Sequence, residues 1–276
     1  MPRKTVLDLR KPKADNRRLV MVTAYDYSMA RLVDQAGVDM VLVGDSLGMV
    51  VQGHADTLQV TLDDMIYHGR CVSRGLEQAH LTVDLPFMSY QISAQQALES
   101  AGRLVKEGCA QSVKLEGGER SAEAIALIAS AGIPVVGHVG LTPQSVHAFG
   151  GFKVQGRSDT AAERIVSDAR AVAEAGAFCI VLEGVPKDVA QRITSELSIP
   201  TIGIGAGPDC DGQVLVCNDL LGMDTRFQPK FVKRYASLEE QIIESVSAYV
   251  EEVRDGSFPT AEHSFERKGL RLAKTS

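Results

Sequence analysis

The chain has 276 residues, of which 45% are hydrophobic and 23% charged, which excludes a disordered, collagen-like or coiled-coil protein. Its net charge of −6 and aromatic content of 5%, with no tryptophan, argue against binding to nucleic acid. No uncharged apolar stretch approaches the ~20 residues of a membrane-spanning helix, so we expect no membrane contact.

The N-terminal stretch and the cysteines indicate a cytoplasmic protein. Residues 1–19 are basic but lack the apolar core of a signal peptide, and Asp8 and Asp15 weaken a transit-peptide interpretation. The five cysteines are odd in number and form no C-x-x-C pair. This pattern disfavours a disulfide framework or a zinc site and favours reduced thiols.

Eight short runs of β-branched and other apolar residues recur along the chain. They are apolar nearly throughout, as is typical of strands that are buried on both faces of a parallel sheet. The predicted strands cover residues 19–25, 40–46, 80–86, 112–118, 134–140, 178–184, 200–207 and 212–219.

Segments with apolar residues at helical spacing lie between these runs, and several are followed by a glycine, the expected stop signal. The predicted helices cover residues 27–37, 63–75, 93–109, 120–132, 159–176 and 187–197. Eight strands that alternate with helices predict an α/β fold of the (β/α)8 barrel type. The alternative is an open, doubly wound sheet, which usually has fewer strands.

No internal repeat, low-complexity tract or Pro/Gly-rich linker divides the chain. We therefore expect one barrel domain over residues 1–276, with an N-terminal extension and a C-terminal helix and tail. A connecting stretch at 226–236 precedes the predicted C-terminal helix at 238–256. We expect the polar closing segment to be partly ordered against a partner.

Four residues are each the first acid after an apolar run: Asp45, Asp84, Glu116 and Glu183. In a barrel the carboxyl ends of the strands meet at one face, where active sites lie. Like charges in one cleft repel unless a cation compensates them, and Mg2+ prefers such oxygen ligands. The alternative is that each acid caps the next helix, which suits Asp45 but neither glutamate, because Glu is not a favoured N-cap.

Two basic side chains accompany these acids. Lys114 lies two residues before Glu116 and points to the same face of the strand. It is either an anchor for a substrate carboxylate or part of a structural ion pair. His138 near the end of its run is a weaker signal, because a lone histidine there is more often a hydrogen-bonded core or rim residue.

Glycine-rich segments are a further feature. Residues 202–207 suggest a nucleotide site, but Pro208 stands where the third glycine of the dinucleotide motif is required. Small residues there would still allow a phosphate or another ligand to approach the backbone closely. The loops at 48–57 and 150–158 are candidates for lids over an active site.

Several long motifs follow one another in order: GDSLGMVVQGH, DLPFMSY, VKLEGGE, GHVGLTPQS, GGFKVQGRS, VLEGVP and IGIGAGPDCDGQVLV. Over roughly residues 3–260 the chain closely resembles the ketopantoate hydroxymethyltransferase family. The resemblance implies a (β/α)8 barrel of the phosphoenolpyruvate/pyruvate type. It also implies transfer of a hydroxymethyl group from 5,10-methylenetetrahydrofolate to 3-methyl-2-oxobutanoate through a Mg2+-stabilised enolate. The product, 2-dehydropantoate, is that of the first committed step of pantothenate and coenzyme A synthesis.

The same resemblance implies roles for individual residues and a homodecameric assembly. Asp45 and Asp84 would bind Mg2+, with Glu116 as a further carboxylate of the metal site that acts through water. Glu183 would be the catalytic base. Contacts to the 2-oxo acid are implied for Asp45, Ser46, Asp84 and Lys114.

Two other functional classes compete with this interpretation. A Mg2+ barrel of the phosphoenolpyruvate mutase and isocitrate lyase type shares the enolate chemistry, but the K-K-C-G-H loop of the lyases does not occur here. A catalytically silent barrel that serves as a binding protein would have gaps in the acidic set, whereas all four acids are present.

Overall fold

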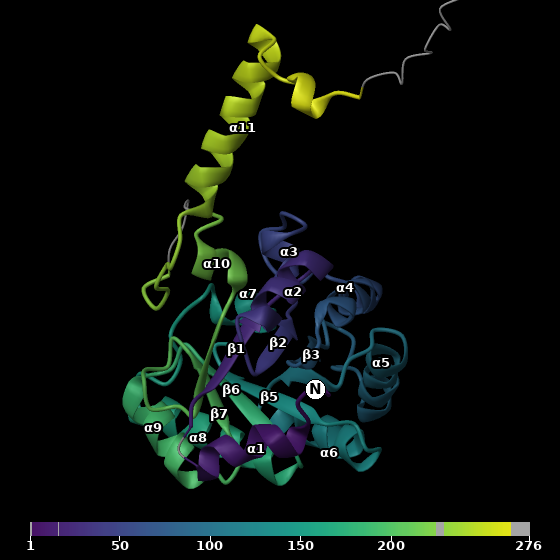
Figure 1. Cartoon of the computed structure of the whole chain (residues 1–276). Helices are drawn as coiled ribbons and strands as arrows, with labels where there is room; N and C mark the ends of the chain where they lie inside the picture. Colours follow the sequence, from purple (N-terminus) through teal and green to yellow (C-terminus); the bar gives the residue numbers. More distant parts are fainter. Residues whose placement is uncertain (1, 16, 225–228, 266–276) are drawn as a thin grey trace, which may run out of the picture.

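The computed structural model describes residues 2–15, 17–224 and 229–265. In this part of the chain, eight parallel strands pair in chain order and the eighth pairs with the first, so the sheet closes into a barrel (Figure 1). The strands are β1 (Leu19–Thr23), β2 (Met40–Val43), β3 (His80–Asp84), β4 (Ser112–Glu116), β5 (Val135–Gly140), β6 (Cys179–Glu183), β7 (Thr201–Ile204) and β8 (Gly212–Leu215). The predicted barrel is confirmed, and the open sheet is excluded.

Each observed strand lies within its predicted run but is usually shorter at the carboxyl end. The second run illustrates the reason, because the strand ends at Val43 and the chain then turns into the short helix α3 (Leu47–Val50). Apolar composition continues past the last ladder hydrogen bond, since the first loop residues are also buried.

The six predicted helices between the strands form the outer layer around the barrel (Figure 1). They are α2 (Tyr27–Gln35), α4 (Leu62–Gly75), α5 (Ala94–Lys106), α6 (Ala122–Ser130), α8 (Asp159–Glu174) and α9 (Lys187–Glu196). Gly37, Gly132 and Gly176 follow three of them with φ of 88°, 84° and 103°, the left-handed conformation that ends a helix. After α5 this conformation falls on Cys109, at φ 61°, instead of on Gly108.

Several short elements were not predicted. They are α1 (Val6–Ala14), α3, α7 (Val146–Phe149), α10 (Cys217–Leu221) and the 3-10 turns η1 (Glu119–Ser121), η2 (Pro143–Ser145) and η3 (Ala261–His263). Of the predicted connecting stretch, residues 226–228 lie outside the described residues, and 229–236 contain no helix.

Two apolar layers hold the barrel together. Side chains that alternate along the strands, such as Met21, Met40 and Val181, fill the barrel interior, and the opposite faces of the strands pack against the outer helices. Helix α1 closes the amino-terminal end of the barrel, at the bottom of Figure 1, where Leu9 is fully buried against the interior cluster. Lys13 of the same helix lies 2.7 Å from the carboxylate of Asp211 before β8.

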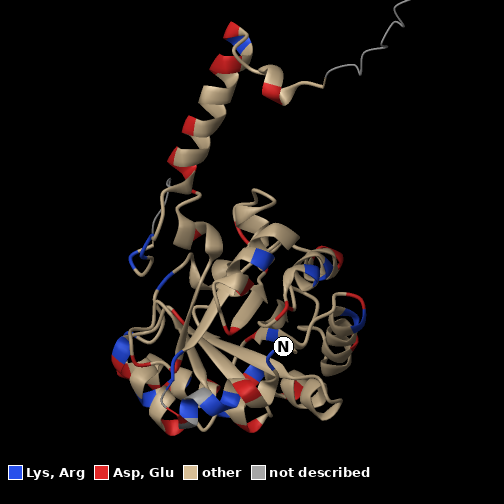
Figure 2. Ribbon diagram, in the orientation of Figure 1, with Lys and Arg blue, Asp and Glu red and all other residues tan. Residues whose placement is uncertain are grey.

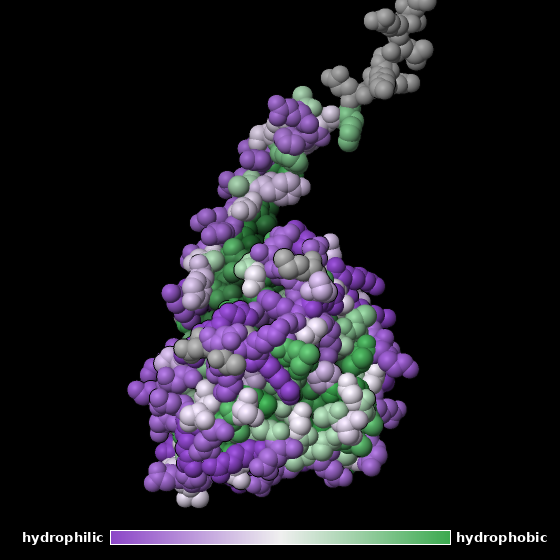
Figure 3. Space-filling model, turned by 60° about the horizontal axis from the view of Figure 1, so that its bottom comes forward, coloured by the Kyte–Doolittle hydropathy of each residue, from purple (hydrophilic) through white to green (hydrophobic). Residues whose placement is uncertain are grey.

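The C-terminal helix α11 (Leu238–Asp255) extends away from the barrel and buries none of its residues (Figure 1). Acidic residues follow one side of it (Figure 2), and apolar side chains gather along it where it leaves the barrel (Figure 3). Its exposed apolar side chains are Ile242, Ile243, Val246, Tyr249 and Val253. Among the helices of the described residues, none is long and apolar enough to cross a membrane.

Candidate active site

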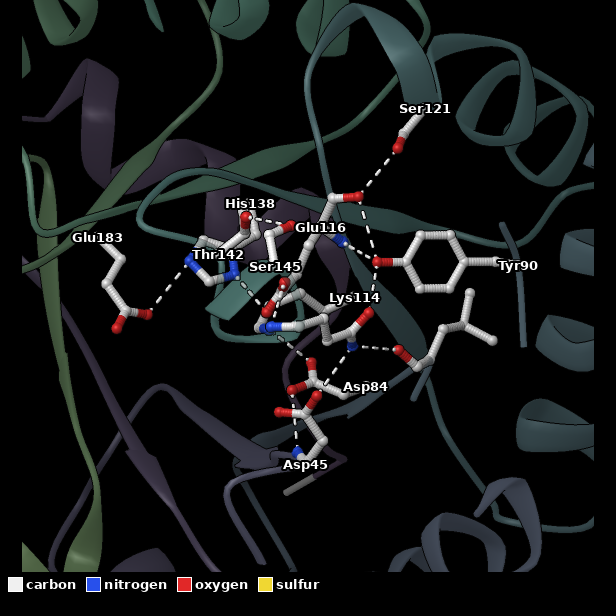
Figure 4. A network of polar contacts seen from close by, with 12 residues as sticks. Asp45, Asp84, Tyr90, Lys114, Glu116, Ser121, His138, Thr142, Ser145 and Glu183 are labelled. Atoms are coloured by element: carbon white, nitrogen blue, oxygen red, sulfur yellow. Dashed lines mark hydrogen bonds and ion pairs between the residues drawn. The ribbon is translucent and has the colours of Figure 1, made fainter. Parts of the chain in front are cut away.

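The four acids selected from the sequence lie together at the carboxyl end of the barrel (Figure 4). Asp84, Glu116 and Glu183 are the last residues of β3, β4 and β6, and Asp45 follows β2 by two positions. Strand register sets the two basic residues beside them. Asp84 pairs with Lys114, and Glu116 pairs with His138.

None of these acids caps the helix that follows it. The helices after the four strands have other residues at their N-caps: Ser46, Ser93, Ser121 and Pro186. The N-cap interpretation of Asp45 is therefore wrong, since its carboxylate instead accepts a hydrogen bond from Nε2 of Gln144 at 2.8 Å. The hydroxyl oxygen of Ser46 lies 2.9 Å from the hydroxyl oxygen of Tyr25.

Asp45, Asp84 and Lys114 form one half of the cluster and are all buried. The backbone N–H of Asp45 donates to Oδ2 of Asp84 at 3.2 Å, and Nζ of Lys114 lies 2.8 Å from Oδ1. Burial, then the charges of Asp84 and Glu116, raise the pKa of Asp45 to about 8. Burial also raises the pKa of Asp84, although Lys114 opposes this shift.

Lys114 keeps its charge despite its burial. Burial alone would lower the pKa of its ammonium group, but the surrounding carboxylates, with Asp84 the strongest, outweigh it and hold that pKa above the usual range. Because Lys114 already contacts Asp84, the structure contains the ion pair that was one of the two interpretations of this residue. A pair at the mouth of the barrel can also bind a substrate carboxylate, so the other interpretation stays open.

Glu116, His138 and Glu183 form the second half. Nδ1 of His138 lies 3.4 Å from Oε1 of Glu116, and Nε2 lies 3.2 Å from Oε2 of Glu183. Burial and Lys114 lower the pKa of His138, but the two glutamates outweigh them and raise it to about 9. The side chain of Glu183 is 18% exposed, against 2% for Glu116, so Glu183 is the acid that reaches solvent.

The sequence analysis underestimated His138, which lies at the centre of the cluster and not at its rim. It missed Tyr90 and Gln144, whose side chains meet at 2.7 Å beside the acids. Both are neutral loop residues, and their only signal was their place in the motifs DLPFMSY and GHVGLTPQS.

The other predicted features lie around this cluster. The 150–158 loop rests on the end of β6, where the N–H of Gln155 donates to the carbonyl of Gly184 at 2.9 Å. His147 of α7, which precedes this loop, lies 4.0 Å from Asp56 of the 48–57 loop. At Gly203 a Cβ would lie 2.9 Å from the sulfur of Cys210, so this glycine is required by packing within the protein.

The acids fit a divalent cation by charge and by donor type. Among the described residues, Lys114 and His138 are the basic side chains that pair with these four carboxylates, which leaves two negative charges when every group is ionised. Within the described ranges no three His, Cys, Asp or Glu side chains surround a common point. Mg2+ commonly uses only one or two carboxylates and completes its shell with substrate and water, so the adjacent Asp45 and Asp84 suit it.

The fold and this site define the class of the protein. It is similar to a phosphonopyruvate hydrolase solved in complex with oxalate and Mg++ (TM-score 0.61, 14% identity, 94% of this chain and 93% of that one). It is also similar to 2,3-dimethylmalate lyase, described as a PEP mutase/isocitrate lyase superfamily member (TM-score 0.60, 18% identity, 99% and 93%). The chain therefore shares the barrel fold of these enzymes, in agreement with the predicted fold class.

Sequence comparison identifies the family within that class. The profile of the ketopantoate hydroxymethyltransferase family matches residues 3–261. The 3-methyl-2-oxobutanoate hydroxymethyltransferase of Pelobacter propionicus is 59% identical over 261 residues, which cover 95% of this chain and 97% of the relative. That of Clostridium beijerinckii is 55% identical over 262 residues, which cover 95% of each. The chain belongs to the ketopantoate hydroxymethyltransferase family and is a one-carbon transferase.

Proposed function

We propose that the chain transfers a hydroxymethyl group from 5,10-methylenetetrahydrofolate to 3-methyl-2-oxobutanoate and so produces 2-dehydropantoate, the first committed step of pantothenate synthesis. The names of its relatives support the acceptor. The observation that carries the mechanism is the division of the acids. Asp45 and Asp84 adjoin each other, whereas Glu183 stands apart and contacts His138.

Asp45 and Asp84 would hold Mg2+, and Glu116 would contact it through a water molecule. When bound, the ion would take up the carboxylate and keto oxygens of the substrate and stabilise the negative charge that develops on the keto oxygen. The crowding of the carboxylates, which together with burial raises the pKa of Asp45, supports a cation at this position.

Lys114 would neutralise and orient the substrate carboxylate, and Ser46 would contact the same end of the 2-oxo acid. Glu183 would remove the proton from C3, because a carboxylate that is bound to a metal is a poor proton acceptor and Glu183 is the acid outside the metal pair. His138 lies 3.2 Å from Glu183 and would hold this carboxylate in place. A bond would then form between C3 and the one-carbon unit, and the bonds from that unit to the folate nitrogens would break. Water would supply the hydroxyl oxygen, and tetrahydrofolate would leave as the second product.

We also propose that copies of the chain associate, as in the homodecamer implied by the family resemblance, and that they work in the cytoplasm. The support for association is α11, which buries none of its residues in one copy and exposes Ile242, Ile243, Val246, Tyr249 and Val253. An exposed apolar face of this kind is typical of a protein–protein contact. Sedimentation velocity of the purified chain would measure the number of copies.

The decisive experiment is deuterium exchange at C3 of 3-methyl-2-oxobutanoate, followed by NMR without folate. Wild type should exchange in the presence of Mg2+. Glu183→Gln should bind the ion and substrate nearly as well but lose most exchange, since a positioned base contributes about 10²–10⁴-fold. Glu99→Gln, on the exposed surface of α5, is the matched control and should exchange normally. Exchange at the wild-type rate in Glu183→Gln would remove Glu183 as the base.

A further inference from the structure

Gln144 lies in the 3-10 turn η2 after β5. Its side-chain amide is buried, and both its nitrogen and its oxygen form hydrogen bonds. Its Nε2 donates to Oδ2 of Asp45 at 2.8 Å and to the carbonyl of Leu85 at 3.0 Å. Its Oε1 accepts from the hydroxyl of Tyr90 at 2.7 Å and from Nε2 of Gln91 at 3.0 Å. The amide thus makes all four hydrogen bonds that its two donors and two lone pairs allow.

The main chain of Gln144 holds a second acid. Its backbone N–H donates to Oε2 of Glu116 at 3.1 Å. One residue therefore contacts the acid after β2 and the acid that ends β4, and the bend of η2 sets the distance between them. Pro143 starts this turn without an N–H, at a position where a helical turn needs none.

The orientation of this amide follows from the neighbours at its two ends. Nε2 faces two acceptors, Oδ2 of Asp45 and the carbonyl of Leu85. Oε1 faces the hydroxyl of Tyr90 at 2.7 Å, and the same hydroxyl lies 3.2 Å from the carbonyl of Glu116 and accepts the N–H of Glu116 at 3.1 Å. The reverse orientation would set Oε1 against the acceptors of Asp45 and Leu85 and the NH2 group against the donor Nε2 of Gln91, at a cost of about 1–3 kcal/mol for each buried group left without a partner.

We infer that Gln144, hydrogen-bonded to Tyr90, is the positioning residue that sets Asp45 and Glu116 for the cation. This inference rests on the proposed function, in which both acids belong to the metal site. Gln144 occupies one oxygen of each carboxylate and leaves Oδ1 of Asp45 for the ion. Partners that orient metal ligands in this way typically contribute 10–100-fold to metal affinity.

The test measures binding of Mn2+ to the full chain by electron paramagnetic resonance of the free ion, with Mg2+ as competitor. Gln144→Met keeps the length of the side chain and removes its amide, and should bind Mn2+ about 10–100-fold more weakly. Tyr90→Phe removes only the hydroxyl that faces Oε1 and should weaken binding in the same direction. Gln95→Leu, on the exposed surface of α5 and outside this network, is the matched control and should bind Mn2+ like wild type.

A structural role and a positioning role differ in one further measurement. If Gln144 positions the ligands, saturating Mn2+ should restore C3 exchange in Gln144→Met to within a few-fold of wild type. Wild-type Mn2+ affinity in both Gln144→Met and Tyr90→Phe would overturn the inference, and so would exchange that saturation does not restore. If Gln144→Met does not fold, the affinity of Tyr90→Phe decides alone. If wild type itself binds no Mn2+, the proposed metal site fails together with this inference.

Discussion

Metal binding at the barrel mouth should displace a proton, and the amount follows from the surroundings of Asp45. Burial and the neighbouring charges of Asp84 and Glu116 raise the pKa of Asp45 to about 8. At pH 7 about 0.9 of the molecules would then carry a proton on this carboxyl group. Because a carboxylate binds a metal only when it is ionised, each ion bound at pH 7 should release about 0.9 of a proton.

The same linkage sets the pH dependence of metal affinity. The ionised fraction of Asp45 rises from about 0.01 at pH 6 to about 0.5 at pH 8, so affinity for Mg2+ should increase about 50-fold over this range. His138 adds little to this change, because a pKa of about 9 keeps it mostly protonated throughout. Isothermal titration calorimetry with Mg2+, in two buffers of different ionisation enthalpy, measures both the affinity and the number of protons released.

The control is Asp45→Asn, which should bind the ion weakly at every pH and release no proton. An affinity that changes less than threefold between pH 6 and 8 in wild type would refute the reasoning. Asp45 would then already be ionised in the free protein between pH 6 and 8, and its pKa would lie below this range.

Two further predictions concern single side chains. Lys114→Met should weaken binding of 3-methyl-2-oxobutanoate by about 2–4 kcal/mol, the cost of losing a charged hydrogen-bonding partner, and should still bind Mg2+. Calorimetric titration checks this, and unchanged substrate affinity would leave Lys114 with only the ion pair to Asp84. Asp34→Ala should destabilise the fold by about 2–4 kcal/mol, because its carboxylate accepts three backbone N–H bonds, including that of the buried Ala79 at 2.7 Å. Urea unfolding measures this, and Asp34→Asn, which keeps an oxygen acceptor, should lose less.

The fold was predictable because it depends on a pattern that repeats. Each strand is buried on both faces, so its apolar run is readable without knowledge of its neighbours. Helix α1 has no such pattern. It contains lysines, an arginine and a proline, and it is held by contacts of Leu9 and Lys13 with distant parts of the chain. The four-residue helix α3 lacks a side-chain cap, so it depends on its surroundings and not on local sequence.

The charged residues of the candidate site could be predicted from the sequence, because their positions at strand ends are visible there. Acids at strand ends stand out in an apolar chain, and the closure of the barrel brings them together. In the sequence, His138 is a single histidine with no visible partner. Its two contacts, Glu116 and Glu183, lie on other strands and reach it only when the barrel has formed. Gln144 carries no charge, and its role depends on which end of an amide faces which neighbour. That information exists only in the folded structure.

Closure of the amino-terminal end by α1 has a consequence for folding. Lys13 pairs with Asp211, 198 positions later in the chain. At 5–20 residues per second, α1 is synthesised about 10–40 s before the residue that it contacts. Leu9 therefore has no complete interior to enter until β8 has closed the barrel. Helix α1 is made before the strands that it covers and should dock among the last elements, so hydrogen exchange in α1 during refolding should report when the barrel becomes complete.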